Sequence, residues 1–430
     1  MGHLAGKDVY RRLAERLDGA PVRMPDHPAL GPLLRELFEP EQADLVARMP
    51  WRLSRLERVA AVVGEPPAAL EARLAPLCRQ GLVLDLVHPG TGERFYMPSP
   101  FVVGIYEFTL MRAGPRADHA RRARLLHEYL ERGAFFRENL GDGQQVLIAR
   151  ALPHADTFAP ATEILSSERV EAVVEGAALL AVGICSCRHE REHLGGRACS
   201  TPLETCTAMG TAAEYLLRHG LARPLSRAEL RDIIARSRQE GLVLAADAVA
   251  RDVAFICHCC RCCCQLLRGL NERGYLNALT TAPFAPRCET PRCTGCGRCV
   301  EACPVGALTG AAPRSAARPA PAAPRLDAAR CIGCGVCATR CAQGALRLGP
   351  GTRRRILPES SFERVILQSL ERGTLQNLVF DDPSSAVQAR MRALLGGLLR
   401  LGPVQRALVS DAFRSRFLRA LAAVSGYDGP

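Results

Sequence analysis

Apolar residues recur at helical spacing along the first hundred positions of the chain. The pattern predicts helices over residues 7–17, 30–37, 40–47, 55–63 and 68–80. Gly81 is placed to end the last of these helices. Two short runs typical of strands follow at 82–87 and 94–97, and a Pro/Gly-containing turn joins them. Paired helices followed by a β-hairpin predict a winged-helix-like module within residues 1–100.

Farther along, helical patterns alternate with short apolar runs. Residues 101–112 and 117–132 have helical character, and we predict a helical connector over 101–160. The apolar runs 178–184 and 253–256 are short enough to be buried strands. The remaining periodic segments predict helices over 166–175, 207–218, 227–239 and 265–273. Residues 161–285 are therefore expected to form an α/β domain.

The last part of the chain returns to helical periodicity, with helices predicted over 387–401 and 404–424 in a C-terminal segment at 351–430. Residues 353–430 carry twelve arginines against seven acidic residues. We interpret these helices as packed on the body of the protein. Docking on a partner or peripheral contact with an anionic membrane is the weaker alternative. No apolar run approaches the roughly 18 residues of a transmembrane helix.

Length and charge narrow the function classes. A chain of 430 residues is long enough for about two to four domains, and the whole reads as an α+β multidomain protein. The net charge of +12 would be compatible with nucleic-acid binding, and Lys7 is the single lysine. Residues 31–100, however, hold eight arginines against nine acidic residues. Because a phosphate-binding face should be basic, this balance favours protein docking over DNA binding by the predicted module.

Twenty cysteines are the strongest chemical signal in the composition. A disulfide framework is typical of short secreted chains, whereas this chain is long and its first residues do not have a signal-peptide pattern. We therefore expect a cytoplasmic location, where the environment is reducing, and cysteines that bind metal.

Eight of these cysteines form two runs of identical spacing. Residues 293–303 and 331–341 each read Cys-x2-Cys-x2-Cys-x3-Cys, the bacterial spacing for a [4Fe–4S] cluster. The first three cysteines let a tight loop surround a cluster, and the glycines between them let the backbone turn closely. Zinc would need only four of the eight thiolates and would not require a second repeat.

On these motifs, residues of about 286–350 resemble the bacterial-type two-[4Fe–4S] ferredoxin domain. The resemblance implies that the last cysteine of each run binds the neighbouring cluster. Cluster I would take Cys293, Cys296, Cys299 and Cys341. Cluster II would take Cys331, Cys334, Cys337 and Cys303. The second run departs from the pattern at Ala342, where the first has Pro304, but this position is not a ligand. A Pro/Ala-rich linker, 310–325, separates the runs and is expected to be extended and solvated.

Ten more cysteines lie between residues 185 and 264. Residues 182–188 and 254–260 have similar patterns, in which an apolar run leads into Cys-x-Cys, so we predict that two strand ends face one site. Six cysteines within 257–264 favour an additional metal site, which we interpret as a third iron–sulfur cluster. A redox-active thiol site and structural packing remain alternatives.

The ligands of this third site are not fixed by spacing. The preferred set is Cys187, Cys199, Cys206 and Cys259, and a local set of Cys185, Cys187, Cys199 and Cys206 is the alternative. His189 and His193 are expected to be neighbours of the site rather than ligands, because iron–sulfur clusters mostly use thiolates. The arrangement is similar to a group of multi-cluster ferredoxin-like proteins that combine a CxCR…C…C run with a CxCCxCCC run. That resemblance implies an organisation but no particular activity.

These features predict an iron–sulfur protein that relays single electrons to or from a redox partner. Motifs for a nucleotide, flavin or haem cofactor are not recognisable. An electron carrier, or an electron-transfer subunit of an oxidoreductase, is expected rather than a stand-alone enzyme. One alternative is a reductase whose third cluster binds substrate at an open iron. Another is a redox-responsive regulator that binds DNA through the winged-helix-like module.

Overall fold

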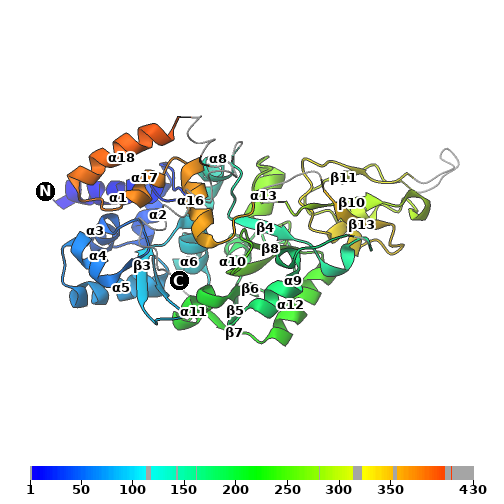
Figure 1. Cartoon of the computed structure of the whole chain (residues 1–430), viewed down its shortest axis with the longest axis horizontal. Coiled ribbons are helices and arrows are strands. Elements are labelled where there is room, and N and C mark those ends of the chain that lie inside the picture. The colour runs from blue at the N-terminus through cyan, green and yellow to red at the C-terminus, as the bar shows by residue number, and fades with distance from the viewer. Residues whose placement is uncertain are drawn as a thin grey trace.

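The computed structural model describes residues 2–112, 118–141, 144–160, 162–279, 281–312, 322–351, 356–401 and 408. It is an α+β structure in which helices predominate. The N-terminal helices lie at one end, a six-stranded sheet lies in the middle, and the loops of the two cysteine runs lie at the other end (Figure 1). Within the described residues, every helix is too short or too polar to cross a membrane.

The N-terminal part is helical with a small sheet. Its helices are α1 (Gly2–Asp18), α2 (Leu30–Leu37), α3 (Pro40–Arg48), α4 (Leu56–Val63) and α5 (Pro67–Gln80). Gly81 ends α5 with a positive φ of 79°, as its position in the sequence predicts. The strands β1 (Ser54–Arg55), β2 (Val83–Val87) and β3 (Arg94–Pro98) form an antiparallel sheet in the order β1-β3-β2. Two helices followed by a hairpin are therefore present in this part of the chain.

Residues 101–160, expected to be a helical connector, also supply a strand. A short irregular turn at Phe101–Ile105 leads into α6 (Tyr106–Leu110), α7 (Asp118–Arg132) and α8 (Phe135–Leu140). The strand β4 (Ala149–Leu152) then pairs with β8 at the edge of the central sheet. This segment is thus part of the same structural unit as the cysteine-rich region.

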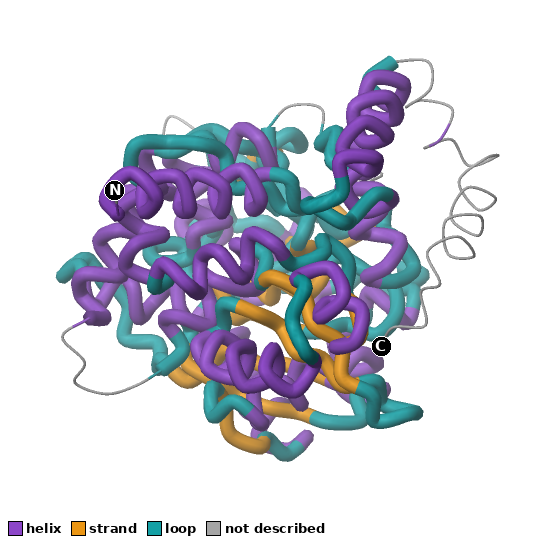
Figure 2. Tube along the Cα trace, turned by 90° about the vertical axis from the view of Figure 1, so that its left-hand side faces the viewer, coloured by secondary structure: helices purple, strands orange, loops and turns teal. Residues whose placement is uncertain are grey.

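The central sheet contains β4, β5 (Leu180–Ile184), β6 (Glu204–Met209), β7 (Ala222–Pro224), β8 (Val243–Asp247) and β9 (Phe255–Cys259). Its order is β4-β8-β9-β6-β5-β7, and every neighbouring pair is antiparallel. The helices α9 (Val170–Gly176) and α12 (Arg227–Glu240) pack on one face through an apolar cluster. The other face meets α6 and α11 (Gly210–Arg218). Helices lie in front of these strands when the molecule is viewed from its N-terminal side (Figure 2).

Cys206 lies on a strand rather than at the start of a helix. The helical spacing over 207–218 predicts one continuous helix, but residues up to Met209 belong to β6 and α11 begins at Gly210. Backbone pairing on both sides of β6, with β5 and with β9, outweighs the helical preference of the short segment.

The two cysteine runs lie beside an antiparallel pair formed by β10 (Phe284–Cys288) and β13 (Leu346–Pro350). Each run contains a one-turn helix, α14 (Arg298–Glu301) or α15 (Val336–Thr339). The linker between them is flanked by the paired strands β11 (Leu308–Thr309) and β12 (Arg325–Leu326), and its residues 313–321 lie outside the described residues.

The C-terminal part contains α16 (Ser361–Glu371), α17 (Leu375–Val379) and α18 (Ala386–Leu399). The predicted helix over 404–424 lies outside the described residues, apart from Leu408. The three described helices join a small apolar cluster with Trp51 of the N-terminal part. The C-terminal segment therefore packs on the body of the protein through α16 and α17, whereas α18 buries only Gly396 and Leu399.

Candidate metal centres

The two cysteine runs line two separate cavities. The larger, of about 190 Å³, is lined by Cys293, Cys296, Cys299 and Cys341 among other residues. The smaller, of about 20 Å³, is lined by Cys303, Cys331, Cys334 and Cys337. Each cavity takes three cysteines from one run and the fourth from the other, which is the grouping that the ferredoxin resemblance implies.

The loops around these cavities need glycine. Gly333 and Gly335 have positive φ values of 69° and 78°. A Cβ atom on Gly333 would lie 2.6 Å from the carbonyl oxygen of Phe284, and one on Gly335 would lie 2.7 Å from Oγ1 of Thr157. Both the backbone conformation and the close neighbours exclude other residues here. The loop is therefore held tightly against the rest of the chain, with its thiols facing the cavity.

The smaller cavity is the more deeply buried. Cys303, Cys334 and Cys337 are buried, whereas Cys296 of the larger cavity is exposed. Burial raises the pKa of Cys334 to about 12. Iron binds the thiolate and displaces this proton, so the donor set is suited to soft-metal ligation at both cavities. The residues present fit two iron–sulfur clusters, one near the surface and one inside.

In the central domain, sheet topology brings the two Cys-x-Cys motifs together. Strands β5 and β9 both run antiparallel to β6 between them, so they are parallel to each other and end at the same edge of the sheet. Cys206 on β6 pairs directly with Cys257 on β9, and Cys185 follows the end of β5. Because side chains alternate along a strand, Cys257 and Cys259 share one face, and His258 lies on the other.

Six thiols meet at this edge, and we call them the inner thiol group. Neighbouring thiols interact pairwise, from Cys185 through Cys187, Cys264, Cys259 and Cys257 to Cys206. Of the residues predicted for the third cluster, Cys185, Cys187, Cys206 and Cys259 lie here. The group offers the four thiolates that a [4Fe–4S] cluster needs and has two to spare.

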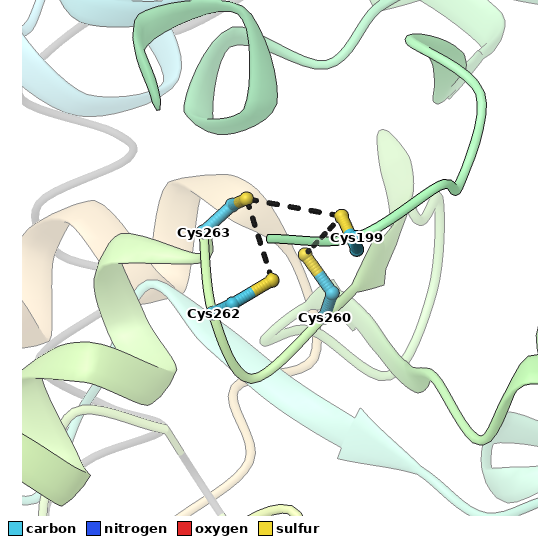
Figure 3. A group of neighbouring side chains, drawn as sticks. All are labelled: Cys199, Cys260, Cys262 and Cys263. Carbon is cyan, nitrogen blue, oxygen red and sulfur yellow. Dashed lines mark hydrogen bonds between the residues drawn. The ribbon is translucent and has the colours of Figure 1, made fainter. Parts of the chain in front are cut away.

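Four other thiols form a second, more compact set, which we call the outer thiol group. It contains Cys199, Cys260, Cys262 and Cys263, whose Sγ atoms all lie within 4.8 Å of one another (Figure 3). Cys199 therefore lies with these three residues, whereas the sequence placed it with Cys187 and Cys206. The loop after α10 (Ser186–His193) carries Cys199 to the turn that follows β9.

Arg188 interacts with both thiol groups. It is fully buried, and its guanidinium donates to Oγ1 of Thr205 and to the carbonyl oxygen of His258. Burial alone would lower the pKa of Arg188, but the charges of Cys185, Cys260 and Cys259 outweigh it and raise the pKa. Among the described residues no carboxylate forms an ion pair with Arg188. Since an uncompensated buried charge is costly, thiolates are its counter-charge.

A chain of polar side chains reaches the inner thiol group from α7. Nδ1 of His127 lies 3.1 Å from Oε1 of Glu190, and the Tyr106 hydroxyl donates to Oε2 of Glu190 at 2.5 Å. Tyr106 also lies close enough to Cys187 for that thiol to raise the pKa of the Tyr106 hydroxyl, after the larger effect of burial. His127 is 27% exposed, whereas Glu190 is fully buried, so the chain connects the surface with the thiols.

Glu107 is a second acidic residue close to the thiols, and burial raises its pKa to about 8. Sequence reasoning assigned no chemistry to residues 101–150. Glu107 is nevertheless the one charged residue in the mostly apolar run 101–110, a pattern that indicates a buried functional group. Cys257 is among the charges that raise its pKa, which places Glu107 beside β9.

His189 and His193 make contacts other than with the thiols. Nδ1 of His189 lies 2.6 Å from the carbonyl oxygen of Leu110, and its Nε2 lies 3.0 Å from Nε2 of His193. Both ring nitrogens of His189 therefore already have partners. His193 also stacks on His119, with ring centroids 5.7 Å apart.

A family model described as a 4Fe-4S dicluster domain matches residues 292–345. The matched residues include both cysteine runs, and Cys288, a fifth cysteine that lines the larger cavity, lies just before them. Neither a curated protein nor a solved structure matched the chain. The chain thus contains a 4Fe-4S ferredoxin-type domain at one end of a larger cysteine-rich structure.

Proposed function

We propose that this protein transfers electrons through two [4Fe–4S] clusters at the cysteine runs and a third iron–sulfur cluster at the inner thiol group. Such clusters accept and release single electrons. The observation that carries the proposal is the grouping of the cysteines: each of two cavities is lined by three cysteines of one run and one of the other, within residues that a dicluster family model matches. The proposed ligands are the eight cysteines of the two runs together with four from the inner thiol group.

One short helix separates the inner thiol group from the smaller cavity. Helix α13 (Gln265–Glu272) begins directly after Cys264. At its other end, Nδ2 of Asn271 donates to the carbonyl oxygen of Pro304 at 2.9 Å, beside Cys303. Eight helical residues span about 12 Å. This proximity supports electron exchange between the third site and cluster II.

The exposed end supports contact with a redox partner. Cys296 is exposed, and Arg298 and Arg340 line the same cavity. Arg292 beside it is about half exposed. Cations around an exposed cluster favour a partner with an acidic surface, which they would steer and orient.

The test is metal analysis of full-length protein purified without air. We expect about twelve irons per chain and a broad absorbance near 400 nm that dithionite bleaches. The double variant Cys187→Ala/Cys259→Ala should lose about four irons. Cys78→Ala is the matched control, because Cys78 is buried in α5 of the N-terminal part. Fewer than about six irons in the reconstituted wild-type protein would contradict the proposal.

Polar groups beside the inner thiol group favour a second candidate, a cluster-dependent reductase. Glu107 and the Tyr106–Glu190–His127 chain could supply protons to a substrate bound at an open iron. If so, an added small anion such as cyanide shifts the electron paramagnetic resonance signal of the third cluster. A pure relay leaves that signal unchanged.

For the N-terminal part we propose a winged-helix-like module that serves as a protein-docking element. Its hairpin already packs against the central domain, where the Tyr215 hydroxyl of α11 donates to the carbonyl oxygen of Val83 in β2 at 3.4 Å. Arg73 pairs with Glu65 and Arg94 with Glu71, so cations near α5 are engaged within the module. This pairing supports protein docking over the DNA-binding alternative.

A further inference from the structure

The outer thiol group differs from the iron–sulfur sites in its size. The Sγ atom of Cys199 lies 3.6 Å from that of Cys260 and 3.9 Å from that of Cys263, and the Sγ atoms of Cys262 and Cys263 are 3.5 Å apart. A single zinc ion with four sulfurs at about 2.3 Å in a tetrahedron sets the sulfurs about 3.8 Å apart. A four-iron cluster holds its thiolates farther apart, because each binds a different iron.

We propose that Cys199, Cys260, Cys262 and Cys263 bind one zinc ion in a closed four-thiolate site. Closed sites of this type are structural, since no coordination position is left for substrate. The proposal is independent of the iron–sulfur assignment, because the two sets have no cysteine in common. It also accounts for four of the six cysteines that one additional cluster would leave unused.

Charges around the outer thiol group suit this metal. Zinc with four thiolates carries a net charge of about −2. Nε of Arg197 donates to the carbonyl oxygen of Cys199 at 3.1 Å, and the guanidinium of Arg188 lies close enough to Cys260 to interact with it by charge. Two cations therefore adjoin two of the four cysteines. Cys260 and Cys263 are buried against Leu242, which shields that side of the site from water.

The position of the site explains what the metal would do. It joins the loop that carries Cys199 to the turn between β9 and α13, in which Cys260 and Cys263 lie between Cys259 and Cys264. Those two flanking cysteines belong to the inner thiol group. Zinc would thus hold in place the turn that carries Cys259 and Cys264 of the inner thiol group. It would not itself carry electrons.

The experiment is metal analysis and X-ray absorption of full-length protein purified without air. We expect about one zinc per chain that resists dialysis against EDTA, with four sulfurs at about 2.3 Å and no neighbouring metal. A short metal–metal distance at zinc, iron in its place, or wild-type protein that contains its iron but no zinc would overturn the proposal.

Variants give a second readout. Cys262→Ala should lower the zinc content from about one per chain to background, while about eight irons remain in the two cysteine runs. Cys262 is the position to change because it is only partly buried. Cys262→His should restore zinc with three sulfurs and one nitrogen, since Cys3His sites are common. Unchanged zinc in Cys262→Ala would overturn the assignment. Cys78→Ala, distant from both groups in sequence, should keep both metals.

Discussion

Arg188 is the residue on which both thiol groups depend. Its charge is buried, and its charge interactions are with Cys185, Cys260 and Cys259. Removing the cation would leave two sets of thiolates without their nearest counter-charge.

We therefore expect Arg188→Met to lower the iron content by about four per chain and to lower zinc as well. Arg191→Met is the control on the same helix, because Arg191 bonds the carbonyl oxygen of Gly196 and no sulfur. Metal analysis of both variants is the measurement. Equal metal contents in the two variants would show that Arg188 has no such role.

The two cysteine runs offer an internal comparison at one glycine. Gly297 and Gly335 occupy the same motif position with φ values of 77° and 78°. A Cβ atom on Gly335 would meet Thr157 at 2.7 Å, whereas one on Gly297 would meet nothing within 4 Å. Gly297→Ala should thus cost about 1 kcal/mol of stability, and Gly335→Ala about 2–4 kcal/mol.

The midpoint for loss of visible absorbance in guanidinium, measured without air, tests this difference. Similar midpoints for the two alanine variants would mean that contact with Thr157 is unimportant. The requirement for glycine could be predicted from the motif, but the contact could not. Thr157 is far from Gly335 in sequence, and only the fold brings the two together.

At the scale of elements, one ion pair joins the N-terminal hairpin to the central domain. Asp85 of β2 accepts hydrogen bonds from Arg218 at the end of α11 and from the adjacent His219. Burial of Asp85 opposes ionisation, but His219 and Arg218 outweigh it and lower the pKa of the carboxyl group. Asp85→Asn should reduce the free energy of unfolding by about 3 kcal/mol.

The lowered pKa of Asp85 also determines how the loss of stability in Asp85→Asn depends on pH. The carboxyl group is ionised in both the folded and the unfolded chain above about pH 5, so the deficit of Asp85→Asn should not shrink between pH 8 and about pH 5. It should shrink as the pH falls through the folded pKa. Urea unfolding followed by Trp51 fluorescence is the measurement, and Asp44→Asn, at a half-exposed pair with Arg12, is the control. A deficit that already shrinks near pH 6 would contradict this account.

Most helices of the N-terminal part, and the strand β5, follow from the spacing of apolar residues. The partition of ten cysteines into two groups does not. It depends on which strands flank β6 and on the path of the loop after α10, and both are set by pairing between distant segments. A one-residue change of register would move each strand cysteine to the opposite face. Local spacing therefore identified which cysteines belong to metal sites but not which of them share a site.

For the whole molecule, the net charge of +12 is a poor guide to partners. Between residues 31 and 100, most arginines are paired with carboxylates, including Arg55 with Glu93 at 2.9 Å. We expect the metal-loaded protein at about 10 µM not to retard duplex DNA in a gel at low salt. Non-specific DNA-binding proteins already bind at about this concentration, so the assay would detect such binding. A salt-sensitive shift in a gel assay would reverse this prediction.

The exposure of Cys296 predicts the order in which the two proposed clusters are lost when the protein is exposed to air. Oxidants reach the larger cavity first, whereas Cys334 and Cys337 lie behind other side chains. Preparations handled in air should therefore lose cluster I before cluster II. Such partly degraded protein would still be brown, because cluster II remains. It would nevertheless have lost the cluster through which a partner could exchange electrons with it.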